Sequence, residues 1–313
     1  MRVFISGATG VLGRRVVQRL SEGGHEVVGL SRSQANSGWL EQNGAEARTG
    51  DLFDQEQMTE LTADCDAILH LATAIPTKAR TKTADWQMND HIRRDGTRVL
   101  VEAAIRNKCK LYVQQSITLI YGEQNGNWVD EESSIPAKQP SILESAVDME
   151  QIIQDAIQQH DLPAITLRFG SFYSHDSAQT QAMLQLVQKG FFPIAGDGQV
   201  YWNLIHVDDA ASAVATAVDN YQAGLGETFN ICDDEPVYYS ELMRFIAETL
   251  GARKPVRFPR FLNNLMLGSH VAGAIFASAR CRNEKVKETL EWKPRFESYR
   301  EGYRSVIGKW LES

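Results

Sequence analysis

The sequence predicts an α/β protein built on a doubly wound parallel sheet, with a smaller, discontinuous lobe formed mainly by its C-terminal part. Three observations support this class. Short β-rich runs alternate with amphipathic helical stretches as far as Arg168. Two of the runs, VVGL and AILHLA, are almost wholly apolar, as in strands buried on both faces. The first run also leads directly into a glycine-rich loop that opens a helix.

The elements of the first half follow in a regular order. The predicted strands are Arg2–Ser6, His25–Leu30, Glu46–Arg48, Ala67–His70, Leu111–Gln115 and Ala164–Arg168. The predicted helices are Val11–Ser21, Gln55–Leu61, Asp85–Ile105 and Ile142–His160. Strands that alternate with helices form right-handed βαβ units, so we expect a parallel sheet covered on both faces.

The rhythm changes in the second half. Gly190–Gly198 is rich in glycine, proline and aromatic residues and is expected to be a loop. A helix at Asp208–Asn220, a strand at Glu227–Cys232 and a helix at Ser240–Leu250 then resume the α/β pattern. We therefore expect residues 1–168 to form one domain and 169–313 mainly the smaller lobe, with about 204–232 returning to the first domain.

Composition excludes several classes of protein. The 313 residues are 43% hydrophobic and 23% charged, which is typical of a soluble globular protein. The net charge of -8 disfavours nucleic acid or an anionic membrane as partner, because phosphate neutralisation supplies most of that affinity. No apolar run reaches the ~18 residues of a spanning helix, and the start resembles a strand, not a signal peptide, so we expect a cytoplasmic protein. The scattered cysteines and histidines predict no metal site.

The strongest local signal is the segment Gly7-Ala8-Thr9-Gly10-Val11-Leu12-Gly13. It follows a strand and opens a helix, which is the context that a dinucleotide-binding loop requires. Gly7 permits the tight turn, Gly10 lets the backbone approach a pyrophosphate, and Gly13 lets the helix pack closely on the strand. The N–H groups of the helix N-terminus then face the phosphates. The alternative is a glycine-rich turn without a ligand.

The end of the second strand indicates which dinucleotide binds. An NAD site usually places an acid there for the ribose 2′-hydroxyl, whereas this chain has Ser31-Arg32-Ser33. Arg32 suits a 2′-phosphate through charge-assisted hydrogen bonds, and Arg14 and Arg15 at the start of the adjacent helix are expected to help. A solvated surface arginine is the alternative. The sequence therefore predicts NADP in preference to NAD.

Further segments complete a family pattern. These segments are Gly50-Asp51-Leu52, His70-Leu71-Ala72, Gly96-Thr97, Gln115-Ser116 with Tyr121-Gly122, Leu167-Arg168-Phe169-Gly170 with Tyr173, His206-Val207-Asp208-Asp209, Phe229-Asn230-Ile231 and Trp292-Lys293-Pro294. In this order they resemble the extended and atypical short-chain dehydrogenase/reductase superfamily, within its NAD-dependent epimerase/dehydratase group. The resemblance implies a Rossmann-type fold. It also implies cofactor contacts from Gly7, Thr9, Gly10, Val11, Leu12, Gly13, Arg32, Asp51, Leu52, Leu71, Ala72, Ser116, Phe169 and Gly170.

Two departures from the family pattern concern its chemistry. The family's working pair is Tyr-x-x-x-Lys, in which the lysine lowers the tyrosine pKa and the tyrosine transfers the proton. Counting back from Glu150, its two positions hold Ile142 and Ala146, and none of the nine tyrosines has a lysine four residues later. Arg93 stands where the family commonly has an asparagine that supports the active site. The usual acid–base pair is therefore missing.

Other groups are candidates to replace it. Ser116 and Tyr121 are the catalytic candidates: Ser116 to orient a substrate oxygen, although it could equally bond to backbone, and Tyr121 to donate a proton. We expect Tyr173 and Trp202 to contact the substrate. Tyr173 and His206 are further acid candidates, and Glu144 with Asp148, four residues apart, more often form a solvated face.

The favoured function is an NADP-binding oxidoreductase or isomerase of the epimerase/dehydratase type, acting on a small organic substrate. One alternative is an NADP-binding regulator or redox sensor without turnover, as in the family's NmrA-like branch. Another is a non-redox enzyme that uses the same fold. The resemblance also implies a homodimer through the helices at Asp85–Ile105 and Ile142–His160.

Overall fold

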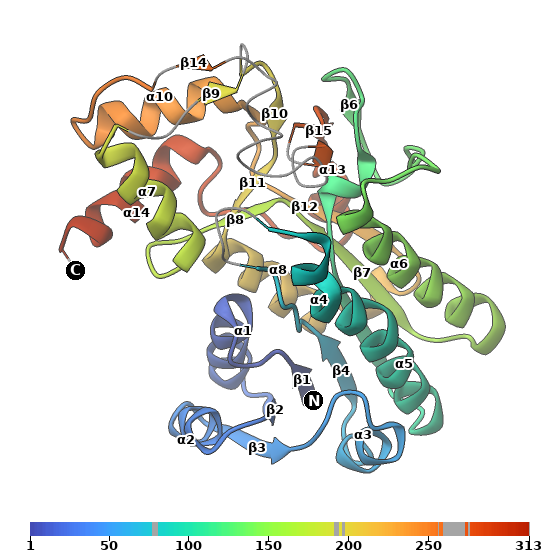
Figure 1. Ribbon diagram of the computed structural model, residues 1–313. Coiled ribbons are helices and arrows are strands. Elements are labelled where there is room, and N and C mark those ends of the chain that lie inside the picture. Colours follow the sequence, from blue (N-terminus) through green and yellow to red (C-terminus); the bar gives the residue numbers. More distant parts are fainter. Residues whose placement is uncertain are drawn as a thin grey trace.

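A seven-stranded sheet forms the centre of the protein (Figure 1). The computed structural model describes residues 1–76, 81–190, 194–195, 198–255, 257–258, 273–274 and 276–312. The strands of the sheet are β1 (Arg2–Ser6), β2 (Glu26–Ser31), β3 (Ala45–Thr49), β4 (Ala67–His70), β5 (Leu111–Ile117), β7 (Ala164–Phe169) and β12 (Thr228–Ile231). They are all parallel, in the order β12-β7-β5-β4-β1-β2-β3. This order confirms the Rossmann-type prediction and puts the switch point between β1 and β4.

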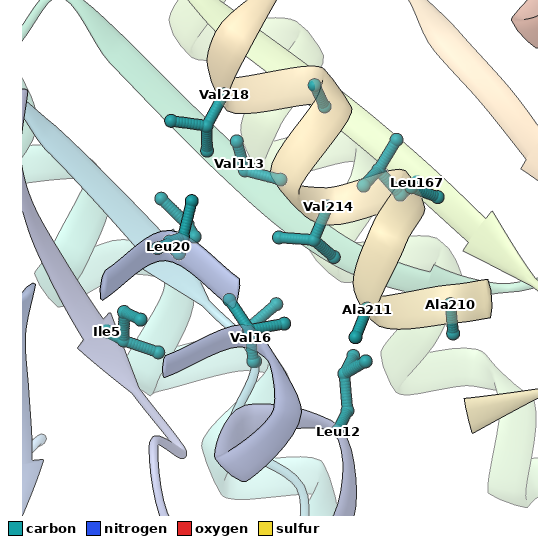
Figure 2. Packing of buried hydrophobic residues seen from close by; sticks show 14 of the residues in the cluster. Ile5, Leu12, Val16, Leu20, Val113, Leu167, Ala210, Ala211, Val214 and Val218 are labelled. Carbon is teal, nitrogen blue, oxygen red and sulfur yellow. The ribbon is translucent and has the colours of Figure 1, made fainter. Parts of the chain in front are cut away.

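Helices cover both faces of the sheet. On one face lie α1 (Val11–Glu22) and α8 (Val207–Asp219), and on the other α3 (Gln55–Leu61), α5 (Thr97–Arg106) and α6 (Ser141–His160). Side chains alternate along each strand, so Val3 and Ile5 join the first core while Phe4 joins the second. Figure 2 shows side chains of the first core, including Leu12, Val16 and Leu20 from α1 and Ala211, Val214 and Val218 from α8.

The smaller lobe has a core of its own. Its principal helices are α7 (Ala178–Gln188), α10 (Tyr239–Thr249) and α14 (Tyr299–Glu312). Its strands pair in twos: β8 (Ser171–Tyr173) with β11 (Leu204–His206), β10 (Tyr201–Trp202) with β13 (Val237–Tyr238), β9 (Ile194–Ala195) with β14 (Arg257–Phe258), and β15 (Arg280–Cys281) with β6 (Trp128–Val129). The predicted loop Gly190–Gly198 contains β9, and its residues 191–193 and 196–197 lie outside the described part.

Several boundaries differ from the expectations. The helix expected at Asp85–Ile105 comprises a 3-10 turn (Thr83–Trp86), α4 (Gln87–His91), a π-helical turn (Ile92–Gly96) and α5. A Cβ on Gly96 would lie 3.0 Å from Leu52 Cδ2, so this glycine lets the segment pack closely on its neighbours. The short helices α2 (Gln34–Gln42), α9 (Tyr221–Gly224) and α13 (Glu284–Thr289) and the 3-10 turn Thr118–Tyr121 carry weaker patterns and were not predicted. The stretch after α13 also returns to the first domain, where Trp292 is buried in its core.

Candidate functional site

The glycine loop lies at the switch point of the sheet. Gly7 has a φ of 79°, which favours glycine, and a Cβ there would lie 2.6 Å from the Ala72 amide nitrogen beyond β4. A Cβ on Gly13 would overlap the Gly7 carbonyl oxygen, so the helix can begin this close only with glycine. Gly10 caps α1 without any side-chain hydrogen bond. The first amides of α1 therefore face the crevice where a dinucleotide pyrophosphate binds in this fold, and the loop fits that group.

The other residues expected to contact the cofactor differ in whether their side chains are buried or exposed. Leu12, Leu52, Leu71 and Phe169 bury their side chains in the two cores that flank the sheet. Val11, Thr9 and Asp51 are at least partly exposed. Gly170 is buried, and a Cβ there would lie 2.8 Å from the Asn203 carbonyl oxygen.

The end of β2 carries serine and arginine. Ser31 is buried and its hydroxyl bonds within the turn, donating to the Ser33 carbonyl oxygen at 2.9 Å. Arg32 is exposed, with no hydrogen bond or ion pair to the described residues. The guanidinium carbon of Arg14 lies 4.7 Å from the centre of the Trp39 ring.

Arg15 does not join these arginines. Its guanidinium is ion-paired with Asp176 at 2.8 Å and with Asp208, and both pairs tie α1 to the second half of the chain. These two ion pairs weigh against the expectation that Arg15 helps to bind a 2′-phosphate, because two carboxylates already match its charge.

Ser116 and Tyr121, the catalytic candidates, belong to one buried polar network. The Ser116 hydroxyl donates to Glu150 at 2.5 Å, and Glu150 is ion-paired with Arg168 at 2.7 Å. Arg168 also donates to the Tyr121 hydroxyl at 2.8 Å, and that hydroxyl donates to Asn230 at 2.9 Å. The sequence analysis assigned no polar contact to Glu150 or Arg168. The arginine within the otherwise mostly apolar strand Ala164–Phe169 was the signal of a buried ion pair.

This network weighs against a catalytic role for either residue. Tyr121 is fully buried, and burial raises its pKa well above the usual value. Ser116 is 1% exposed, with its hydroxyl committed to a carboxylate. Both side chains connect β5, α6, β7 and β12 inside the protein, so neither presents a proton to a ligand in this arrangement.

The first two turns of α6 carry Ile142 and Ala146, the positions at which counting from Glu150 puts the family's acid–base pair. Ile142 and Ala146 are buried there, and Ile142 clusters with Leu143 and Ala274. Trp86, Ile117 and Leu119 pack against these three residues. We refer to these six residues as the α6 apolar cluster. Glu144 and Asp148 are exposed on the opposite side, with Asp148 ion-paired to Arg94 at 2.6 Å, as expected for a solvated face.

A buried cation lies beside this cluster. Arg93, in the π-helical turn, is 5% exposed and its Nη1 donates to the Ile142 carbonyl oxygen at 3.3 Å and to Ser145 at 3.4 Å. Burial lowers its pKa to about 10, which leaves the guanidinium charged at neutral pH.

The other candidates lie in or near the smaller lobe. Tyr173 is buried in the lobe core and stacks on Tyr303, so its geometry weighs against contact with a substrate. His206 accepts the Asp208 amide hydrogen at 3.1 Å as the cap of α8, and burial lowers its pKa to about 4. Trp202 is partly exposed and lines a small pocket together with Thr118 and Ser171. The cavity volume of this pocket is about 20 Å³.

The sequence analysis named His70 only as part of the segment His70-Leu71-Ala72 at a strand end. Its Nδ1 lies 2.7 Å from the Ser6 hydroxyl of β1, and its Nε2 lies 3.3 Å from the Ile92 carbonyl oxygen. Burial lowers its pKa to about 4, so the ring is neutral, and the Nε2–H donates to Ile92. The imidazole therefore connects the strand before the glycine loop to the π-helical turn that carries Arg93.

The described residues contain no group of three or more histidine, cysteine, aspartate or glutamate side chains arranged to hold a metal ion. None of the helices described here is both long and apolar enough to span a membrane.

The fold and the glycine loop define a nicotinamide-dinucleotide-binding protein of the Rossmann type. Residues 3–232 match the NAD dependent epimerase/dehydratase family, and the chain belongs to that family. It is therefore an NAD(P)-dependent protein of the oxidoreductase or epimerase kind.

Similar proteins differ in what their names say. The chain is 27% identical to a 3-diazoavenalumate denitrifying reductase from a Streptomyces species, over 96% of this chain and 99% of the relative. It is 26% identical to a ceramide reductase from Caulobacter vibrioides, over 98% and 90%. A UDP-glucose 4-epimerase structure from Thermotoga maritima superposes with a TM-score of 0.80 at 20% identity, covering 100% of this chain and 99% of that one. A dTDP-glucose 4,6-dehydratase from Streptomyces venezuelae, solved with NAD, also gives 0.80, at 18% identity and with 100% and 98% coverage.

Proposed function

We propose that this protein is an NADPH-dependent reductase of a small aromatic molecule whose reacting group takes up hydride without a proton from the protein. An aryl diazonium group is the chemistry that fits best. The single observation that carries the proposal is that buried apolar side chains stand at both counted positions: Ile142, which belongs to the α6 apolar cluster, and Ala146.

The cluster selects against carbonyl substrates. Hydride addition to a ketone produces an alkoxide, which needs a proton donor, and general acid catalysis typically contributes about 10²- to 10⁴-fold. Ile142 and Ala146 can neither donate a proton nor stabilise an anion, and Tyr121 and Ser116 are bonded within the interior. An electrophile that already carries a positive charge becomes neutral on receiving hydride, so it needs no acid.

A diazonium group meets this requirement. Bound NADPH supplies the hydride. Its addition to the terminal nitrogen of Ar–N₂⁺ gives Ar–N=N–H; the carbon–nitrogen bond then breaks and a carbon–hydrogen bond forms, leaving Ar–H, N₂ and NADP⁺. Charge and atoms balance without any further reactant. The name of the Streptomyces relative, a diazo compound's denitrifying reductase, supports this choice over other cations.

Arg32 supports NADP in preference to NAD. The arginine is exposed and has no hydrogen bond or ion pair to the described residues. No acid stands at the end of β2 to accept hydrogen bonds from a ribose 2′-hydroxyl. A free guanidinium in this place suits a 2′-phosphate.

The test compares substrates at fixed protein and NADPH. We expect NADPH oxidation and arene formation in equal amounts with a benzenediazonium salt, and little oxidation with acetophenone or benzaldehyde. Gly10→Val, which fills the approach to the pyrophosphate, is the control for the spontaneous reaction between NADPH and the salt. Ketones reduced as fast as the diazonium salt would overturn the proposal. Tight NADPH binding without turnover of any compound would favour a regulator instead.

A further inference from the structure

Three side chains form one stripe on the segment before α5. Trp86, Asn89 and Arg93 follow each other at helical spacing and share a face. Trp86 packs in the α6 apolar cluster, and Arg93 donates to Ile142 at the start of α6. Asn89 accepts the Ala74 amide hydrogen at 3.0 Å, from the loop that leaves β4. The stripe therefore lies between the exit of β4 and the start of α6, at the carboxyl edge of the sheet where ligands bind in this fold.

The amide in this stripe has an unused donor. Asn89 is 0% exposed. Its Oδ1 is bonded, but its buried Nδ2 has no hydrogen-bond partner among the residues that the structure describes. A buried polar group without a partner costs free energy, so such groups in native proteins call for an explanation.

The guanidinium in the stripe lacks a counter-charge. Among the described residues, Arg93 has no carboxylate within ion-pair distance, and its two hydrogen bonds, both to neutral oxygens, exceed 3.2 Å. Asp90 on the same segment acts on it only through space. Asp148 of α6 is already paired with the neighbouring Arg94. A buried cation in this state is stabilised by an anion that brings its own acceptors.

We propose that Asn89 and Arg93 form a binding site for the carboxylate of an aromatic substrate, with the aromatic ring lying on the α6 apolar cluster. This assignment deepens the proposed function and rests on it for placing the substrate at this edge. A carboxylate matches the planar guanidinium, accepts from the Asn89 amide and neutralises one charge. A phosphate dianion would need a second cation, which the described contacts do not supply.

The experiment measures binding and not turnover. Calorimetric titrations of the NADP⁺-saturated protein compare cinnamate with methyl cinnamate, which has the same ring but no charge. We expect the acid to bind about ten- to a hundredfold more tightly, as charge-assisted hydrogen bonds allow. Arg93→Met should abolish this preference and Asn89→Leu should reduce it. Arg94→Met, which removes the neighbouring half-exposed arginine, is the matched control and should leave the preference intact.

Several outcomes would overturn the assignment. These are equal binding of acid and ester, no binding of the acid at millimolar concentration, and a preference that survives in Arg93→Met. Circular dichroism verifies that each variant folds, and Arg93→Lys keeps the charge if Arg93→Met does not fold. Failure of reductase turnover with the acid preference intact would count against the proposed function alone. Turnover of a benzenediazonium salt, which carries no carboxylate, together with equal binding of cinnamate and its methyl ester would count against this site alone.

Discussion

The two halves of the proposed crevice differ in the atoms that shape them: backbone atoms in one half and side chains in the other. The nucleotide half, around Gly7 and Gly13, is shaped by backbone, because side chains would collide with Ala72 and with the loop itself. The proposed reaction half, around Ile142 and Arg93, is shaped by side chains from four separate segments. A phosphate site formed by backbone requires glycine wherever a Cβ would collide with other backbone atoms, as at Gly7 and Gly13. A side-chain site can exchange its chemistry while the fold stays the same, and this difference explains how one family serves many reactions.

Restoring the family's acid–base pair should have the largest effect on the reaction half. Ala146 is fully buried beside Ser145, so a lysine there needs the charge of Arg93 removed. We expect Ile142→Tyr/Ala146→Lys/Arg93→Asn to reduce benzaldehyde about 10²-fold or more faster than wild type. The control replaces tyrosine by phenylalanine at 142 in the same background. Equal rates for the two variants would show that this turn does not face the reacting group.

Gly13→Ala tests the nucleotide half. The added Cβ would overlap the Gly7 carbonyl oxygen and approach Ala8 Cα to 2.8 Å, and both are backbone atoms that cannot easily move. We expect a loss of about 3 kcal/mol in the free energy of unfolding, together with weakened NADPH binding. Gly38→Ala in α2, where a Cβ meets nothing within 4 Å, should be tolerated. Denaturant unfolding and NADPH titration measure both effects.

The pH dependence of stability tests whether His70 connects β1, before the glycine loop, to the π-helical turn that carries Arg93. Burial lowers the pKa of His70 from 6.5 to about 4, so its contribution is present above pH 6.5 and is lost as pH falls towards 4. The loss should reach about 3 kcal/mol in the free energy of unfolding. The difference between wild type and His70→Gln should shrink accordingly on acidification. A constant difference for His70→Gln across this pH range would contradict the assignment.

Arg32→Ala tests the choice of cofactor. We expect NADPH affinity to fall by about ten- to a hundredfold with NADH affinity unchanged, because only the 2′-phosphate meets the guanidinium. Fluorescence titration with both nucleotides measures this. Equal binding of NADPH and NADH to the wild type would show that NADP is the wrong cofactor.

Ser116→Ala should have the smallest effect. The variant removes one hydrogen bond to Glu150, which keeps its ion pair with Arg168. We expect a loss of about 1 kcal/mol in the free energy of unfolding and no change in the rate of reduction. Tyr121→Phe should behave similarly. A large loss of turnover in either variant at unchanged stability would restore these residues as catalytic.

The sequence by itself determined the sheet and the nucleotide half. Apolar strand runs and the Gly7–Gly13 spacing depend on local backbone geometry, so they are readable without any contact information. Counting back from Glu150 also predicts that the family's acid–base pair is missing at Ile142 and Ala146, and this stays a prediction.

Only the tertiary structure decided what each polar group does. Ser116 and Tyr121 were expected at the ligand, but their partners Glu150 and Asn230 lie 34 and 109 residues away along the chain. Arg15 was expected to bind phosphate, and its carboxylates Asp176 and Asp208 lie even further away. Hydrogen bonds and ion pairs depend on distances in space, and no local pattern records which distant residue the fold brings within 3 Å of a side chain.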